Sequence, residues 1–273
     1  MNASDCRRSG RLMLISPQRV FYSGLLGRPR QRTGGGYYVY AALRGQLRIA
    51  TADVAVAGEL LMVAPYVPHN VESEHSCIIS LMIEPETVEP AAMARLSAEM
   101  AGVAAPAAAQ RIRAAYESLR LRERPDGFTT SDFDRQFFGE VLPVRAIDPR
   151  IRRSLTRLND FSGSKLMATD CAAAAGLSPS RFLHLFKQET GISFRALRAW
   201  KRARHLLHFV NEDINLAHLA QDIGYPDSTH FSHSIRHFYG LKPRAIFSGS
   251  RDLAIYRGEA GLRPGPGLRQ GRP

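Results

Sequence analysis

Polar and basic side chains recur at helical spacing in two stretches near the carboxyl end of the chain. His184 and Lys187 in the first stretch correspond to His233 and Arg236 in the second. Lysine and arginine bind phosphate as cations, and histidine donates a single hydrogen bond to a base edge. These stripes predict DNA contacts. With their neighbours, the predicted DNA-binding residues are Ser180, Arg181, His184, Lys187 and Gln188, and then Ser228, Thr229, His230, His233, Arg236 and His237.

The two stripes belong to an internal duplication. Residues 171–197 (CAAAAGLSPSRFLHLFKQETGISFRAL) are echoed by residues 219–246, with one extra residue in the second turn. In each copy a helix ends at a glycine, Gly176 or Gly224, which accepts the left-handed conformation that follows a helix end. A single copy is also compatible with an ordinary helical bundle. Two copies with matched basic stripes predict two helix-turn-helix units.

The segment between the two units predicts one long helix over residues 194–212. Nineteen residues at 1.5 Å each span roughly 28 Å. Successive major-groove openings on one face of B-DNA lie about 34 Å apart. We therefore expect this helix to hold two recognition helices near one turn of DNA apart.

These features resemble the AraC/XylS family of bacterial transcription regulators over about residues 150–248. The motifs are AxxxGLSxSRFxxxFKxxTGxSFRxxR, WKRARHLL and AxxIGYxDSTHFSxxxRxxxGLKP. The resemblance implies that the helices around 180–188 and 229–237 enter adjacent major grooves. Three residues depart from the usual pattern. Met167 stands where a capping Ser or Thr is usual, Leu183 at a commonly polar outward position, and Ile235 in place of a phenylalanine.

The amino-terminal part is strand-like, and GELLMVAPYVPHNV (residues 58–71) resembles, less specifically, a cupin-like sensor barrel. A metal-binding cupin also needs an HxH motif, but residues 34–40 (GGGYYVY) contain no histidine. One histidine cannot hold a catalytic metal. We expect a metal-free barrel without cofactor that binds a small organic effector through Tyr38, Tyr40 and His69. The alternative is a filled barrel that serves only for dimerisation.

The expected fold class is an α+β multidomain protein. It combines an amino-terminal cupin-like β-barrel plus helices with a carboxyl-terminal all-α domain of two helix-turn-helix units. The expected parts are a sensor barrel (15–90), a helical packing or dimerisation region (91–145), the DNA-binding domain (150–248) and a flexible Gly/Pro-rich tail (249–273).

Charge is unevenly distributed in this chain, whose net charge is +12. Residues 33–149 hold ten basic and fifteen acidic residues, whereas residues 150–248 hold fifteen basic and seven acidic ones. A basic domain beside an acidic one predicts a polyanionic partner. There is no apolar run of the ~18 to 20 residues that a membrane span needs, and no export signal. The three cysteines form no CxxC pair, which argues against a disulfide framework and favours a cytoplasmic location.

We therefore expect a sequence-specific transcription factor that is not an enzyme and has no catalytic residues. Its expected partners are double-stranded promoter DNA, RNA polymerase, a small-molecule effector and a second copy of the chain. Three alternatives remain open: an active cupin enzyme, zinc on His230, His233 and His237, and RNA binding. The third is disfavoured because A-form RNA closes its major groove to side chains.

Overall fold

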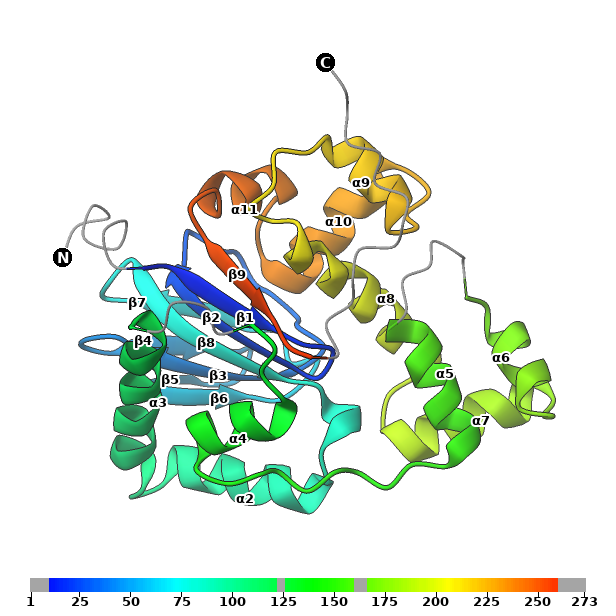
Figure 1. Ribbon diagram of the computed structural model, residues 1–273, viewed down its shortest axis with the longest axis horizontal. Helices are drawn as coiled ribbons and strands as arrows, with labels where there is room; N and C mark the ends of the chain where they lie inside the picture. The colour runs from blue at the N-terminus through cyan, green and yellow to red at the C-terminus, as the bar shows by residue number, and fades with distance from the viewer. Residues whose placement is uncertain (1–9, 122–125, 160–165, 260–273) are drawn as a thin grey trace.

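The computed structural model describes residues 10–121, 126–159 and 166–259. It contains a β-rich amino-terminal part with three helices and a carboxyl-terminal group of helices (Figure 1). The expected α+β class and the two helix-turn-helix units are confirmed.

The larger sheet has six strands and is covered on both faces. In sheet order they are β6 (Leu60–Val63), β3 (Tyr37–Ala42), β8 (Cys77–Ile83), β2 (Arg19–Leu25), β1 (Leu12–Ile15) and β9 (Ala254–Arg257). All neighbours are antiparallel except β1 and β9. Because both faces are buried, β8 is nearly continuously apolar (CIISLMI).

The smaller sheet has three strands, in the order β5 (Ala55–Gly58), β4 (Leu47–Ala50) and β7 (Asn70–Ser73). Ile49 and Val71, which are paired across β4 and β7, are buried in one core with Tyr40 and Val63 of the larger sheet. The two sheets therefore form the sandwich-like body of the amino-terminal part.

Three helices cover the opposite face of the larger sheet (Figure 1): α2 (Pro90–Ala101), α3 (Ala105–Arg120) and α4 (Thr130–Phe138). Strand alternation explains this second core, since Val39 and Leu81 point away from the first core and lie with Ile112 and Phe137. A short 3-10 helix, η1 (Pro85–Thr87), connects β8 to these helices.

The carboxyl-terminal helices are α5 (Pro149–Asn159), α6 (Ala168–Ala174), α7 (Pro179–Thr190), α8 (Phe194–His205), α9 (Leu216–Asp222), α10 (Ser228–Tyr239) and α11 (Pro243–Gly249). The prediction of one helix over 194–212 is wrong. The helix α8 ends at His205, and the 3-10 turn η2 (Leu206–His208) follows. Phe209 and Val210 are buried where the chain turns, so tertiary burial outweighs the helical pattern.

The expectation of a flexible tail from residue 249 is wrong for its first part. Residues 254–257 form β9, which runs parallel to β1. This pairing supplies backbone hydrogen bonds to a segment containing Ile255 and Tyr256, which are residue types that favour strands. Residues 260–273 of the expected tail lie outside the described residues. The first strand also begins at Leu12, before the expected boundary at 15.

Two observations concern the expected cellular environment. Cys77 is disulfide-bonded, whereas Cys171 is buried and free. A sequence with no paired cysteine motif does not show which thiols meet in space. Among the described residues, every helix is too short or too polar to cross a lipid bilayer.

Candidate DNA-binding site and adjoining cavity

The first helix-turn-helix unit consists of α6, a turn at Gly176 and α7. Gly176 has φ +64°, the left-handed conformation expected of it. The hydroxyl of Ser178 accepts a hydrogen bond from the Arg181 backbone N–H at 3.4 Å, and Pro179 follows at the first helical position. Met167 provides no side-chain cap for α6. At the start of α6 the Asp170 carboxylate accepts a hydrogen bond from the Met167 backbone N–H at 3.2 Å, but this helix lacks the N-cap side chain that α7 has.

The outward face of α7 carries the predicted residues of the first unit. Phe182, Phe186 and Thr190 are buried on the other side of the helix. The side chain of Leu183 is 43% exposed, so it also lies outward, as its sequence position indicated. All five predicted residues are exposed: Ser180, Arg181, His184, Lys187 and Gln188. That they contact DNA stays a prediction.

The second unit repeats this geometry with better caps. Asn215 accepts hydrogen bonds from two backbone N–H groups at the start of α9. At the start of α10, one carboxylate oxygen of Asp227 accepts from the backbone N–H groups of Thr229 and His230, both at 2.8 Å. The other oxygen lies 2.8 Å from Nδ1 of His230. The His230 ring is therefore held beside the cap.

The predicted residues of the second unit gather on one side of α10, opposite the buried Phe231, Ile235 and Phe238. Arg236 is only half-exposed. The exposed ones are Ser228, Thr229, His230, His233 and His237. Their role in DNA contact stays a prediction. Among the described residues, no three potential metal ligands come together, and this includes the histidines of α10.

The predicted effector residues lie together in the core between the two sheets. Tyr38 and Tyr40 stack with ring centroids 5.5 Å apart. The Tyr40 hydroxyl lies 3.0 Å from Nε2 of His69, whose Nδ1 lies 2.8 Å from the Val67 carbonyl oxygen. Burial lowers the pKa of His69 to about 4, so the ring is neutral at pH 7. Nδ1 then donates to the carbonyl, and Nε2 accepts from the hydroxyl.

A cavity of about 260 Å³ lies beside this cluster, between the larger sheet and the second helix-turn-helix unit. Tyr38 and Ser80 line it from the sheet, and Leu207, Tyr239 and Ile246 from the helices. Tyr40 and His69 do not line it. The sequence thus predicted one residue that lines the cavity, Tyr38, together with the neighbouring Tyr40 and His69. It did not predict the lining residues from the carboxyl-terminal helices.

Three residues of α8 contact the amino-terminal part, and the sequence pattern does not predict these contacts. Trp200, Lys201 and Arg204 were read as parts of a connecting helix, yet all three are buried. They fall at i, i+1 and i+4, and hence on one side of α8. An amphipathic pattern with two cations on the buried side was the available signal, although it did not identify their partners.

Comparison with known proteins agrees with this architecture. Residues 171–248 match a family described as "Helix-turn-helix domain". A stretch of 101 residues is 30% identical to the regulatory protein PocR of Salmonella typhimurium. It covers 36% of this chain and 33% of PocR, so the match spans about a third of that relative.

Two solved structures share the fold over most of the chain. ToxT from Vibrio cholerae O395 has a TM-score of 0.55 and 10% identity, with 86% of this chain and 99% of that chain covered. A fatty-acid-bound ToxT from strain SCE256 has a TM-score of 0.52 and 9% identity, with coverage of 86% and 96%. These likenesses establish the shared two-part fold. The family match shows that residues 171–248 form a helix-turn-helix domain, as the sequence motifs predict.

Proposed function

We propose that this chain is a sequence-specific transcription regulator that binds double-stranded promoter DNA through α7 and α10. The supporting observation is the pair of helix-turn-helix units whose outward faces carry matched basic and histidine side chains. In this proposal Lys187 and Arg236 contact phosphates, whereas His184, Thr229 and His233 contact base edges.

Variants of the full chain test this assignment. Lys187→Ala should weaken binding to all duplexes about equally and reduce the salt dependence of the affinity by about one phosphate contact. Arg48→Ala is the control, because it removes one positive charge from an exposed position on β4, far along the chain from α7. Equal losses in the two variants would show that overall charge, and not the α7 face, governs DNA affinity.

The proposed effector is a small apolar acid that binds in the cavity between the sheet and the second unit. The walls are mainly aliphatic and aromatic, and Arg28 and Arg32 also line the cavity. Nε of Arg32 is buried and has no hydrogen-bond partner among the described residues. A guanidinium in an apolar cavity favours a carboxylate. The ToxT of strain SCE256, which has the same fold, binds an unsaturated fatty acid, a ligand of the same chemical class.

Thermal unfolding with a series of fatty acids tests this part of the proposal. Each acid is compared with the alcohol of equal chain length, which lacks the charge. A bound acid should raise the melting temperature by mass action, and Arg32→Gln should abolish most of the difference between acid and alcohol. Equal effects of acids and alcohols would contradict an anionic ligand.

Further partners follow from the proposed function. Regulation of a promoter implies contact with RNA polymerase, in the cytoplasm where bacterial DNA lies.

The helices α2, α3 and α4 are the proposed surface for a second copy of the chain. Sedimentation of the full chain at several concentrations measures this self-association, and a monomer at all concentrations would refute it.

A further inference from the structure

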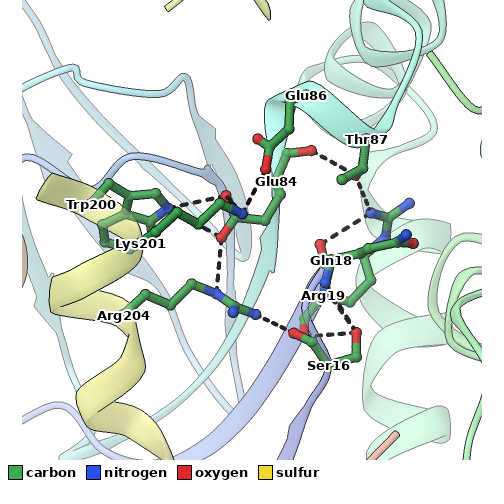
Figure 2. A network of polar contacts seen from close by, with 9 residues as sticks. All are labelled: Ser16, Gln18, Arg19, Glu84, Glu86, Thr87, Trp200, Lys201 and Arg204. Carbon is green, nitrogen blue, oxygen red and sulfur yellow. Dashed lines mark hydrogen bonds and ion pairs between the residues drawn. The ribbon is translucent and has the colours of Figure 1, made fainter. Parts of the chain in front are cut away.

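A buried cluster of charges joins α8, the helix that links the two helix-turn-helix units, to the amino-terminal part (Figure 2). We call α8 the linker helix. The Lys201 ammonium lies 3.0 Å from the Glu84 carboxylate and 2.6 Å from that of Glu86. Nε of Arg204 lies 2.9 Å from the other oxygen of Glu84. The Trp200 indole N–H is 3.1 Å from both Glu84 oxygens. Each side contributes two charges, so the cluster is electrically balanced.

These charges depend on one another because none of them reaches solvent. The exposed fractions of the four charged residues are 5% or less. Burial raises the pKa of Glu84, and the nearby Lys201 ammonium opposes that rise. Removing one partner leaves an uncompensated buried charge. This charge strongly disfavours the arrangement in which α8 is packed against the amino-terminal part.

The amino-terminal side of the cluster is itself firmly held (Figure 2). The Arg204 guanidinium donates a hydrogen bond to the Ser16 carbonyl, just before β2. Arg19 at the start of β2 donates to the Thr87 hydroxyl at 2.8 Å and forms a buried ion pair with Asp134 of α4. The linker helix is thus attached to a rigid network that spans the sheet and its helical layer.

A second attachment holds the end of α10. The backbone N–H groups of Arg30 and Thr33 donate to the carbonyls of Gly240 and His237, each at 2.9 Å. Adding a Cβ at Gly240 would place it 2.3 Å from the Arg30 carbonyl oxygen, which shows how closely the loop approaches. The second recognition helix is therefore fixed to the amino-terminal part at its carboxyl end.

We infer that the Glu84–Glu86–Lys201–Arg204 cluster is an autoinhibitory latch that fixes the second helix-turn-helix unit until DNA binding opens it. This inference rests on the proposed function. Two recognition helices must align with major-groove openings about 34 Å apart. The charge cluster and the backbone contacts of Arg30 and Thr33 instead hold the second unit in one placement against the amino-terminal part. Lys187 of α7 and His233 of α10 are exposed among the described residues, so the latch acts on orientation.

Trp200 allows the latch to be observed directly, because it is the only tryptophan in the sequence and is fully buried in the cluster. The probe is duplex DNA selected by the full chain from a random library. Glu86→Gln should open the latch, expose Trp200 to water and shift its emission to longer wavelength. It should also raise the affinity for this DNA by about fivefold or more, which is the lower end of the usual range for allosteric coupling. Glu72→Gln is the matched control, since it makes the same change in an exposed pair with Arg48. It should leave both properties unchanged.

The remaining outcomes separate the latch from the proposed function. A red shift in Glu86→Gln with unchanged or lower DNA affinity would overturn the inhibitory role. Unchanged emission and affinity would overturn the latch itself. If Glu86→Gln does not fold, Lys201→Met, which removes the opposing cation, is judged by the same two readouts. Failure of the parent chain and every variant to select any duplex would refute the proposed function, whatever the emission shows.

Discussion

Replacing Gly35 by alanine should displace Trp200 and loosen the contact between the two parts of the chain. An added Cβ would lie 2.3, 2.6 and 2.7 Å from three atoms of the indole ring. Cβ atoms essentially never approach other heavy atoms within 3.0 Å, so the ring must move. The ring is enclosed by Tyr38 and Phe238, at centroid distances of 6.5 and 5.4 Å, and cannot shift freely.

The magnitude follows from two opposing effects. Overpacking of a core costs about 1–3 kcal/mol. Replacing glycine by alanine at a backbone conformation that alanine can adopt recovers about 0.4–1 kcal/mol, since the unfolded chain loses entropy. The free energy of unfolding should therefore fall by about 1.3 kcal/mol at the middle of these ranges, and by at most about 2.6 kcal/mol. For a chain of this size each kcal/mol lowers the melting temperature by about 2–4 °C.

Urea and thermal unfolding of the full chain, followed by Trp200 fluorescence, measure the effect. Gly58→Ala is the control, because its Cβ would make an ordinary contact of 3.4 Å with Leu61. The Gly35→Ala protein should be less stable than this control and should emit at longer wavelength before unfolding. Wild-type stability together with wild-type emission would refute the packing argument.

Three further changes have defined outcomes. Asp134→Asn leaves Arg19 buried without its counter-charge, so calorimetry should show a loss of about 3–5 kcal/mol, and a loss below about 1 kcal/mol would contradict the burial of this pair. Met167→Ser supplies the missing cap of α6 and should stabilise the chain by about 0.5–2 kcal/mol in urea unfolding, whereas destabilisation would place the start of the helix elsewhere. Burial lowers the pKa of His205 to about 4 and that of His208 to about 2. Below the histidine pKa of about 6.5, the unfolded chain binds more protons than the folded chain. The free energy of unfolding should therefore be full above pH ~6.5 and fall as the pH drops toward about 4. A pH-independent free energy of unfolding across this range would refute the burial of these histidines.

The helix-turn-helix units could be predicted because their signals are local. The turn at Gly176, the cap at Asp227 and the outward position of Leu183 each depend on residues within one or two helical turns. Period-two alternation likewise placed Tyr38 and Tyr40 on one face of β3, although only the structure shows that this face meets the smaller sheet.

The features that the sequence did not reveal depend on distant pairs. Glu84 and Trp200 are 116 residues apart, and no periodicity links them. The pairing of β9 with β1 joins opposite ends of the described chain in the same way. The cavity, too, requires residues from both parts, so neither the strand pattern nor the helical repeat could indicate it. Single-sequence patterns specify elements, whereas these contacts arise from how the elements pack.

Selection of binding sites by the full chain from random duplex DNA tests the proposed DNA recognition most directly. We expect two short preferred blocks whose centres lie about 10–10.5 base pairs apart, one for α7 and one for α10. His233→Ala should relax the preference at one or two positions of one block and leave the other intact. No enrichment of any sequence, or a single block unaffected by His233→Ala, would contradict the claim that two helix-turn-helix units together recognise DNA.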